Sequence, residues 1–134
     1  MIEIFDNYLP EHEYECIRAY FEGDNDGGAI HNSCAWTYYP GITLKNDGHF
    51  QFVHLVFSQH TVLSPAYDLL APIINKEKMC AIARIKANCT THTAEVVEFT
   101  NGFHTDFNSD IMTGIYYINT NDGYTFFEDA SKCD

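Results

Sequence analysis

An imidazole and a carboxylate two residues apart, His104 and Asp106, are the side chains in this sequence best suited to bind a metal ion. They follow a strand-like run, and in an extended chain residues i and i+2 point to the same face. Nitrogen and oxygen ligands of this kind suit a first-row divalent metal, and two imidazoles with one carboxylate indicate non-haem Fe(II). The same spacing is also typical of a solvated turn, so both interpretations stay open.

The segment after this pair predicts a β-hairpin. Residues 110–119 form a strand-like run, Asp122 and Gly123 supply a tight turn, and a second strand is expected over 124–129. The candidate metal pair therefore lies at the start of a hairpin.

Four segments in this order resemble the 2-oxoglutarate and Fe(II)-dependent oxygenases, in particular the prolyl-hydroxylase-like branch and its relatives among bacteriophage and marine microbial proteins. The matching segments are residues 84–88 (RIKAN), 102–107 (GFHTDF), 113–119 (TGIYYIN) and 121–129 (NDGYTFFED). The resemblance implies a mainly β fold with flanking helices, the double-stranded β-helix, which is a cupin-like jelly roll of eight core strands. It also implies hydroxylation of a substrate, with oxidative decarboxylation of 2-oxoglutarate to succinate and CO2.

The resemblance also assigns site residues. His104 and Asp106 match the family's metal ligands, and Tyr117 matches a tyrosine that helps to hold 2-oxoglutarate. Asn88 is a further neighbour of this cosubstrate. On the same predicted strand Arg84 and Lys86 alternate with small or apolar residues, and these two cations either meet the dicarboxylate or pair with some of the chain's 19 acidic residues. The implied cofactors are Fe(II) and 2-oxoglutarate, with ascorbate as an optional reductant.

The sequence departs from this family downstream of the metal pair. The family has a second metal-binding histidine and an arginine or lysine that anchors the far carboxylate of 2-oxoglutarate. Here no histidine follows His104, and Lys132 is the only cation in the tail. A C-terminally short or degenerate domain is therefore expected. His54 and His92 are upstream histidines that could replace the missing ligand, although the family gives neither of them support.

Three classes of function follow from this mismatch. The chain is a dioxygenase completed by further sequence or by a partner, an inactive cupin-like binding module, or an interaction protein. In the third class an open sheet edge pairs with another chain, because unpaired edges are templates for association. A homo-oligomer or a complementing chain is then the expected partner. Iron-dependent succinate formation separates the first class from the other two.

Composition limits the partners. A chain of 134 residues with 46% hydrophobic content predicts one domain over 1–134 with a real core. The net charge of -12 argues against a nucleic-acid partner, which usually requires a basic surface. The acidic N-terminus and the lack of a long apolar run predict a cytoplasmic protein without a membrane span. The unidentified substrate is expected to be a peptide side chain or a small metabolite.

The remaining pattern predicts the elements that carry the site. A helix is expected over 10–22, with Tyr14, Ile17 and Phe21 on its buried side. A second helix should begin at Ser64-Pro65 and be kinked or shortened by Pro72. Further strands are expected over 33–39, 50–57, 80–88 and 94–99.

Two predictions concern single side chains in this pattern. Residues 50–57 are apolar on both faces, which indicates an internal strand, and its His54 is expected to be a core histidine hydrogen-bonded to backbone. The five cysteines include no C-x-x-C pair, so we expect reduced and mostly buried thiols.

Overall fold

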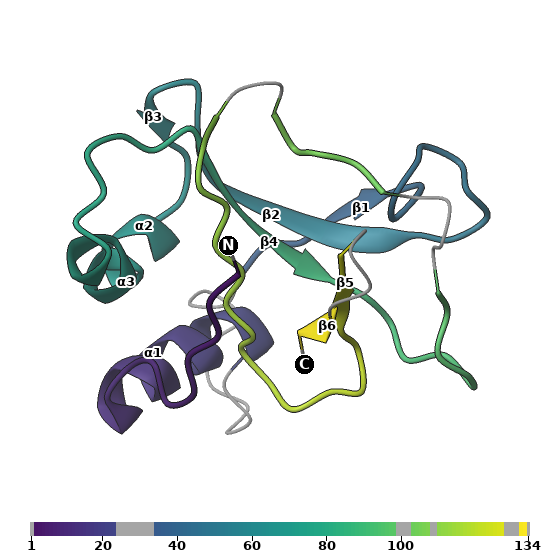
Figure 1. Cartoon of the computed structure of the whole chain (residues 1–134), viewed down its shortest axis with the longest axis horizontal. Coiled ribbons are helices and arrows are strands. Elements are labelled where there is room, and N and C mark those ends of the chain that lie inside the picture. The colour runs from purple at the N-terminus through teal and green to yellow at the C-terminus, as the bar shows by residue number, and fades with distance from the viewer. Residues whose placement is uncertain (1, 24–33, 99–102, 108–109, 128–131, 134) are drawn as a thin grey trace.

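A computed structural model describes residues 2–23, 34–98, 103–107, 110–127 and 132–133 of the chain (Figure 1). The helices and strands in chain order are α1 (Glu11–Glu22), β1 (Thr37–Tyr39), β2 (Gln51–Ser58), β3 (Thr61–Val62), α2 (Ala66–Leu69), α3 (Ala71–Lys76), β4 (Arg84–Cys89), β5 (Thr125–Phe126) and β6 (Lys132–Cys133). They form a small antiparallel sheet with flanking helices, and Figure 1 shows α1, α2 and α3 grouped toward one end of the molecule.

Strand β2 is the centre of the sheet. It pairs antiparallel with β4 from Phe52 to Ser58. The first half of β2 also pairs with β1, and its last two residues also pair with β3, so these two short strands share the edge opposite β4. This arrangement confirms the prediction that the strand around His54 is internal. Strands β5 and β6 form a separate two-stranded pair.

Helix α1 packs against the core with the side that was predicted to be buried. Ile17 is fully buried and Phe21 is 6% exposed, and both belong to the core, while Tyr14 packs against it. The core also contains Leu9, Cys34, Val56 and Ala66. Gly23 directly follows the helix with φ of 84°, a conformation that favours glycine. The helix predicted over 10–22 is therefore confirmed.

A bulge in β2 sets which side chains face the helices. The register with β4 shifts between Leu55 and Phe57, which leaves Val56 as the extra residue, and Val56 is fully buried. On β4, Ile85 and Ala87 pack against the core. Because side chains alternate along a strand, Arg84, Lys86 and Asn88 point to the opposite face of the sheet.

The second helix is interrupted as predicted. It begins after Ser64, whose hydroxyl accepts a hydrogen bond from the Ala66 amide at 3.1 Å. The helix breaks at Leu70, and α3 starts again with Pro72 in its first turn. The first turn of a helix tolerates proline, because an N–H at that position would have no partner within the helix.

Two predicted strands are wrong. Residues 94–98 and 110–119 form no strand, and residue 99 of the first predicted strand lies outside the described residues. The second segment packs without strand pairing, because Tyr116 and Ile118 contact the core while Ile111, Met112 and Ile115 are exposed. The Tyr14 hydroxyl donates to the Ile118 carbonyl at 2.8 Å, which fixes this segment to α1.

Other strand boundaries also differ from prediction. Strand β1 begins at Thr37 and β4 at Arg84, later than expected, and β3 was not predicted. Residues 128–129 of the last predicted strand lie outside the described residues. Within the described part of the chain, no helix is long and apolar enough to cross a membrane.

Candidate functional site

His104 and Asp106 lie on the same side of their segment. His104 Nε2 is 3.9 Å from Asp106 Oδ1, and the two side chains are 54% and 34% exposed. Residues 103–107 belong to no strand. The ring of Phe103 contacts Phe126 of β5, with 5.6 Å between centroids, and this contact attaches the segment to the second small sheet.

The separation of these two ligand atoms fits a metal ion after a small adjustment. Two ligands at about 2.1 Å from a metal and at right angles to each other are about 3.0 Å apart. The observed 3.9 Å is therefore close to a chelating separation. Among the described residues, no group of three or more His, Cys, Asp or Glu side chains is placed to hold a metal. His104 and Asp106 would supply two ligands for the iron that the resemblance implies, and the facial triad needs one more.

Arg84 forms an ion pair with the same carboxylate. Its Nη2 is 2.8 Å from Asp106 Oδ2, and the two side chains are 28% and 34% exposed. The guanidinium also lies over the Phe107 ring, 5.0 Å from its centroid. Of the two roles predicted for Arg84, pairing with an acidic residue is the one seen here. Asp106 therefore has one oxygen toward a cation and the other toward an imidazole.

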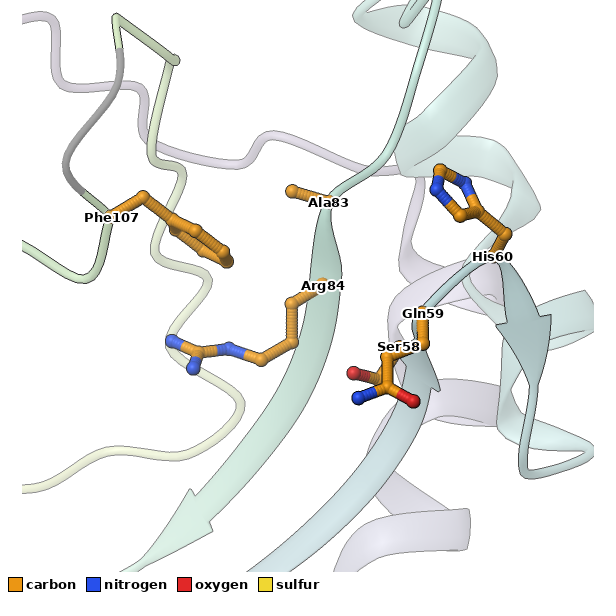
Figure 2. Close-up of a pocket in the computed structure, with 6 residues that line it drawn as sticks. All are labelled: Ser58, Gln59, His60, Ala83, Arg84 and Phe107. Atoms are coloured by element: carbon orange, nitrogen blue, oxygen red, sulfur yellow. The ribbon is translucent and has the colours of Figure 1, made fainter.

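A pocket of about 420 Å³ adjoins this ion pair (Figure 2). It is lined by Ser58, Gln59, His60, Ala83, Arg84 and Phe107. This volume falls within the roughly 300–1,000 Å³ of small-molecule sites, but the pocket is a depression open to solvent. Figure 2 shows Phe107 and the Arg84 guanidinium on one side of β4, with the turn between β2 and β3 on the other.

Sequence reasoning missed the part of the pocket that the β2–β3 turn contributes. Gln59 and His60 connect the two strands with φ of 50° and 61°. Two-residue hairpin turns with positive φ at both positions usually contain Asn or Gly. Because neither residue is of that type, the sequence carried no clear signal for this turn.

The two remaining cosubstrate residues lie at different places. The Tyr117 hydroxyl is 2.8 Å from Thr125 Oγ1, which puts it beside β5. Asn88 is exposed and lies on the same face of β4 as Arg84. Arg84 and Asn88 are four residue steps apart along β4, which is about 13 Å at roughly 3.3 Å per residue. A cosubstrate that contacts both would have to lie along β4.

His54 is hydrogen-bonded to backbone, as predicted, but it is half-buried and is not one of the fully buried core residues. Its Nδ1 donates to the Ala35 carbonyl at 2.8 Å, and its Nε2 is 2.7 Å from the Ser64 hydroxyl. Its ring contacts the aromatic rings of Tyr20, Phe21 and Trp36. It pairs in register with Ala87, whose side chain faces the core, whereas Arg84 faces the other way. Both nitrogens are thus engaged away from Asp106. His92 is exposed and lies outside any strand or helix.

The cysteines differ from prediction in their exposure. Cys34 is buried, and burial raises the pKa of its thiol to about 11, with Cys89 adding to the effect. Cys16, Cys80 and Cys89 are exposed, so the expectation of mostly buried thiols is wrong for the described cysteines. All four are free, and no disulfide forms among them.

A comparison with protein-family models, curated proteins and solved structures found no significant match to this chain. Function therefore has to be argued from the residues. Their geometry brings together an imidazole and a carboxylate that could hold a metal, a cation paired with that carboxylate, and a pocket beside the ion pair.

Proposed function

We propose that this chain is a non-haem Fe(II), 2-oxoglutarate-dependent dioxygenase of the prolyl-hydroxylase-like type. It hydroxylates a peptide side chain or a small metabolite in the cytoplasm, with release of succinate and CO2. Its sheet belongs to a double-stranded β-helix. The observation that carries the proposal is the convergence of His104 and Asp106 to 3.9 Å on one side of their segment.

The roles of the residues follow from their chemistry. His104 and Asp106 hold the iron, which when bound supplies the redox chemistry that links cosubstrate decarboxylation to hydroxylation. Arg84, Asn88 and Tyr117 supply charge and hydrogen bonds for 2-oxoglutarate. With Arg84 over its face, the Phe107 ring shields one side of the Asp106 ion pair from water.

Metal binding is the first test. We expect wild type to bind Mn(II), used as a redox-stable substitute for Fe(II), and the His104→Ala, Asp106→Ala double variant to lose that binding. Affinity should be modest because two protein ligands hold the ion, and it should weaken in acid because protons compete for the ligands. The exposed His92→Ala variant is the matched control. Equal uptake by wild type and the double variant in calorimetry contradicts the site.

Turnover is the second test. Succinate release is measured with Fe(II), ascorbate, oxygen and 2-oxoglutarate. We expect little or no release from this chain alone, and robust release once a histidine and a cation are supplied by added sequence or by a partner. Strong iron-dependent release by the 134-residue chain, abolished in Asp106→Ala, would mean that another residue already completes the site.

A second candidate function is an inert binding module on the same fold. The observation in its favour is the Arg84–Asp106 ion pair, in which the guanidinium contacts the carboxylate at 2.8 Å and competes with a metal for it. Such a module would show no Mn(II) or Fe(II) binding in calorimetry. It would also release no succinate after added sequence or a partner supplied the histidine and the cation.

A further inference from the structure

The pocket beside the ion pair has the chemistry of an anion site. Ser58 and Arg84 are register partners on neighbouring strands, so their side chains start on the same face of the sheet, and Figure 2 shows the Arg84 side chain extending from there toward Phe107. The next two residues, Gln59 and His60, add an amide and an imidazole from the turn. Phe107 forms an apolar wall under the guanidinium. Hydroxyl, amide, imidazole and guanidinium groups all donate hydrogen bonds, and Arg84 provides the positive charge.

The chain's own carboxylate competes for that charge. Asp106 Oδ2 takes one guanidinium N–H at 2.8 Å, in the geometry that a ligand carboxylate would use. The pair is partly exposed, and ion pairs of this kind contribute little stability because water and salt compete with them. A small anion can therefore replace Asp106 at modest cost.

We propose that this pocket binds a small organic anion through a carboxylate or phosphate group, and that Asp106 is an internal competitor that leaves Arg84 when the anion enters. The anion site depends only on Arg84 and the pocket. One consequence rests on the proposed function, namely that a metal drawing Asp106 away from Arg84 makes the anion bind more tightly. By reciprocity the anion then strengthens metal binding by the same factor.

The first experiment uses no metal. Glutarate and phosphate, which distinguish a carboxylate from a phosphate preference, are titrated in chelator-treated buffer and followed by NMR. We expect the Asp106→Asn variant to bind the preferred anion roughly fivefold more tightly than wild type, the factor that corresponds to about 1 kcal/mol. Asp122→Asn, which removes the same charge from an exposed turn, should stay within about twofold of wild type. A gain in affinity cannot come from misfolding.

Two further variants locate the charge. Arg84→Gln should weaken binding more than about tenfold, because a charge-assisted pair is lost. Lys86→Gln removes the same charge two residues along the same face of β4, and should change affinity by less than about twofold. Equal losses in these two variants, or no tightening in Asp106→Asn, would overturn the anion site.

Adding Mn(II) to wild type separates this inference from the proposed function. Tighter anion binding with Mn(II) supports both. If Asp106→Asn tightens binding but Mn(II) does not, the anion site stands and the metal site fails. If Mn(II) binds at His104 and Asp106 while Asp106→Asn leaves anion affinity unchanged, the metal site stands and the anion site fails.

Discussion

Replacing His54 with alanine should destabilise the fold and leave metal binding unchanged. The side chain makes hydrogen bonds to the Ala35 carbonyl at 2.8 Å and the Ser64 hydroxyl at 2.7 Å. Each is worth about 1 kcal/mol. The loss of its aromatic contacts adds about another 1 kcal/mol, for a total near 3 kcal/mol. At about 2.1 cal/mol/K per residue, a chain of 134 residues has an unfolding entropy near 0.3 kcal/mol/K. The expected decrease in Tm is therefore about 10 °C.

The assay combines thermal unfolding with Mn(II) titration of the folded protein at a temperature well below both midpoints. His92→Ala is the control, because this exposed histidine should change neither quantity. The reasoning is refuted if His54→Ala reduces Mn(II) affinity strongly while its Tm stays at the wild-type value. That result would make His54 a metal ligand and require a rearrangement of the sheet.

Three other predictions concern stability. The Asp47 carboxylate accepts hydrogen bonds from four backbone amides of its loop, and these keep its pKa below the usual range. The Ile42 amide contributes most. The stabilising effect of the Asp47 carboxylate should therefore be complete above pH of about 4 and decline as the pH falls below it, so the Tm difference between wild type and Asp47→Asn should shrink in acid. In the β2–β3 turn, His60→Gly should raise stability by about 1 kcal/mol, because glycine accepts a positive φ without strain, and a lower urea midpoint would contradict this. Burial, assisted by a hydrogen bond to Glu77, raises the pKa of Tyr8 to about 12. Wild type should therefore lose stability between about pH 10 and 12. In alkaline unfolding curves, Tyr8→Phe should lose less stability over this range.

The parts of the fold that could be predicted are those set by local pattern. The spacing of Ile17 and Phe21 identified the buried side of α1, and Pro72 marked the break in the second helix. The apolar faces around His54 identified the central strand. The strand prediction failed at 110–119, because an apolar run does not show whether a partner strand is present.

The parts of the site that could be predicted are similarly local. The i, i+2 spacing placed His104 and Asp106 on one side, and chemistry alone suggested that Arg84 would pair with an acid. The sequence could not identify Asp106 as that acid, because 22 residues separate the two and the contact depends on how the chain returns to the sheet. The pocket residues Gln59 and His60 were missed for a different reason, because their turn contains none of the usual turn residues.

The ion pair also explains how a segment without strand pairing is held beside the sheet. Arg84 is the first residue of β4, and its position is fixed by register with Ser58 of β2. Arg84 contacts Asp106 and the Phe107 ring, and these contacts hold the loop with the H-x-D pair beside the sheet. A metal that closes the 3.9 Å gap between His104 and Asp106 must draw the carboxylate toward the imidazole, and so strain or break the contact that orders the loop. In the proposed site we therefore expect the ion pair to reduce metal affinity, and an anion that binds Arg84 in place of Asp106 to restore that affinity.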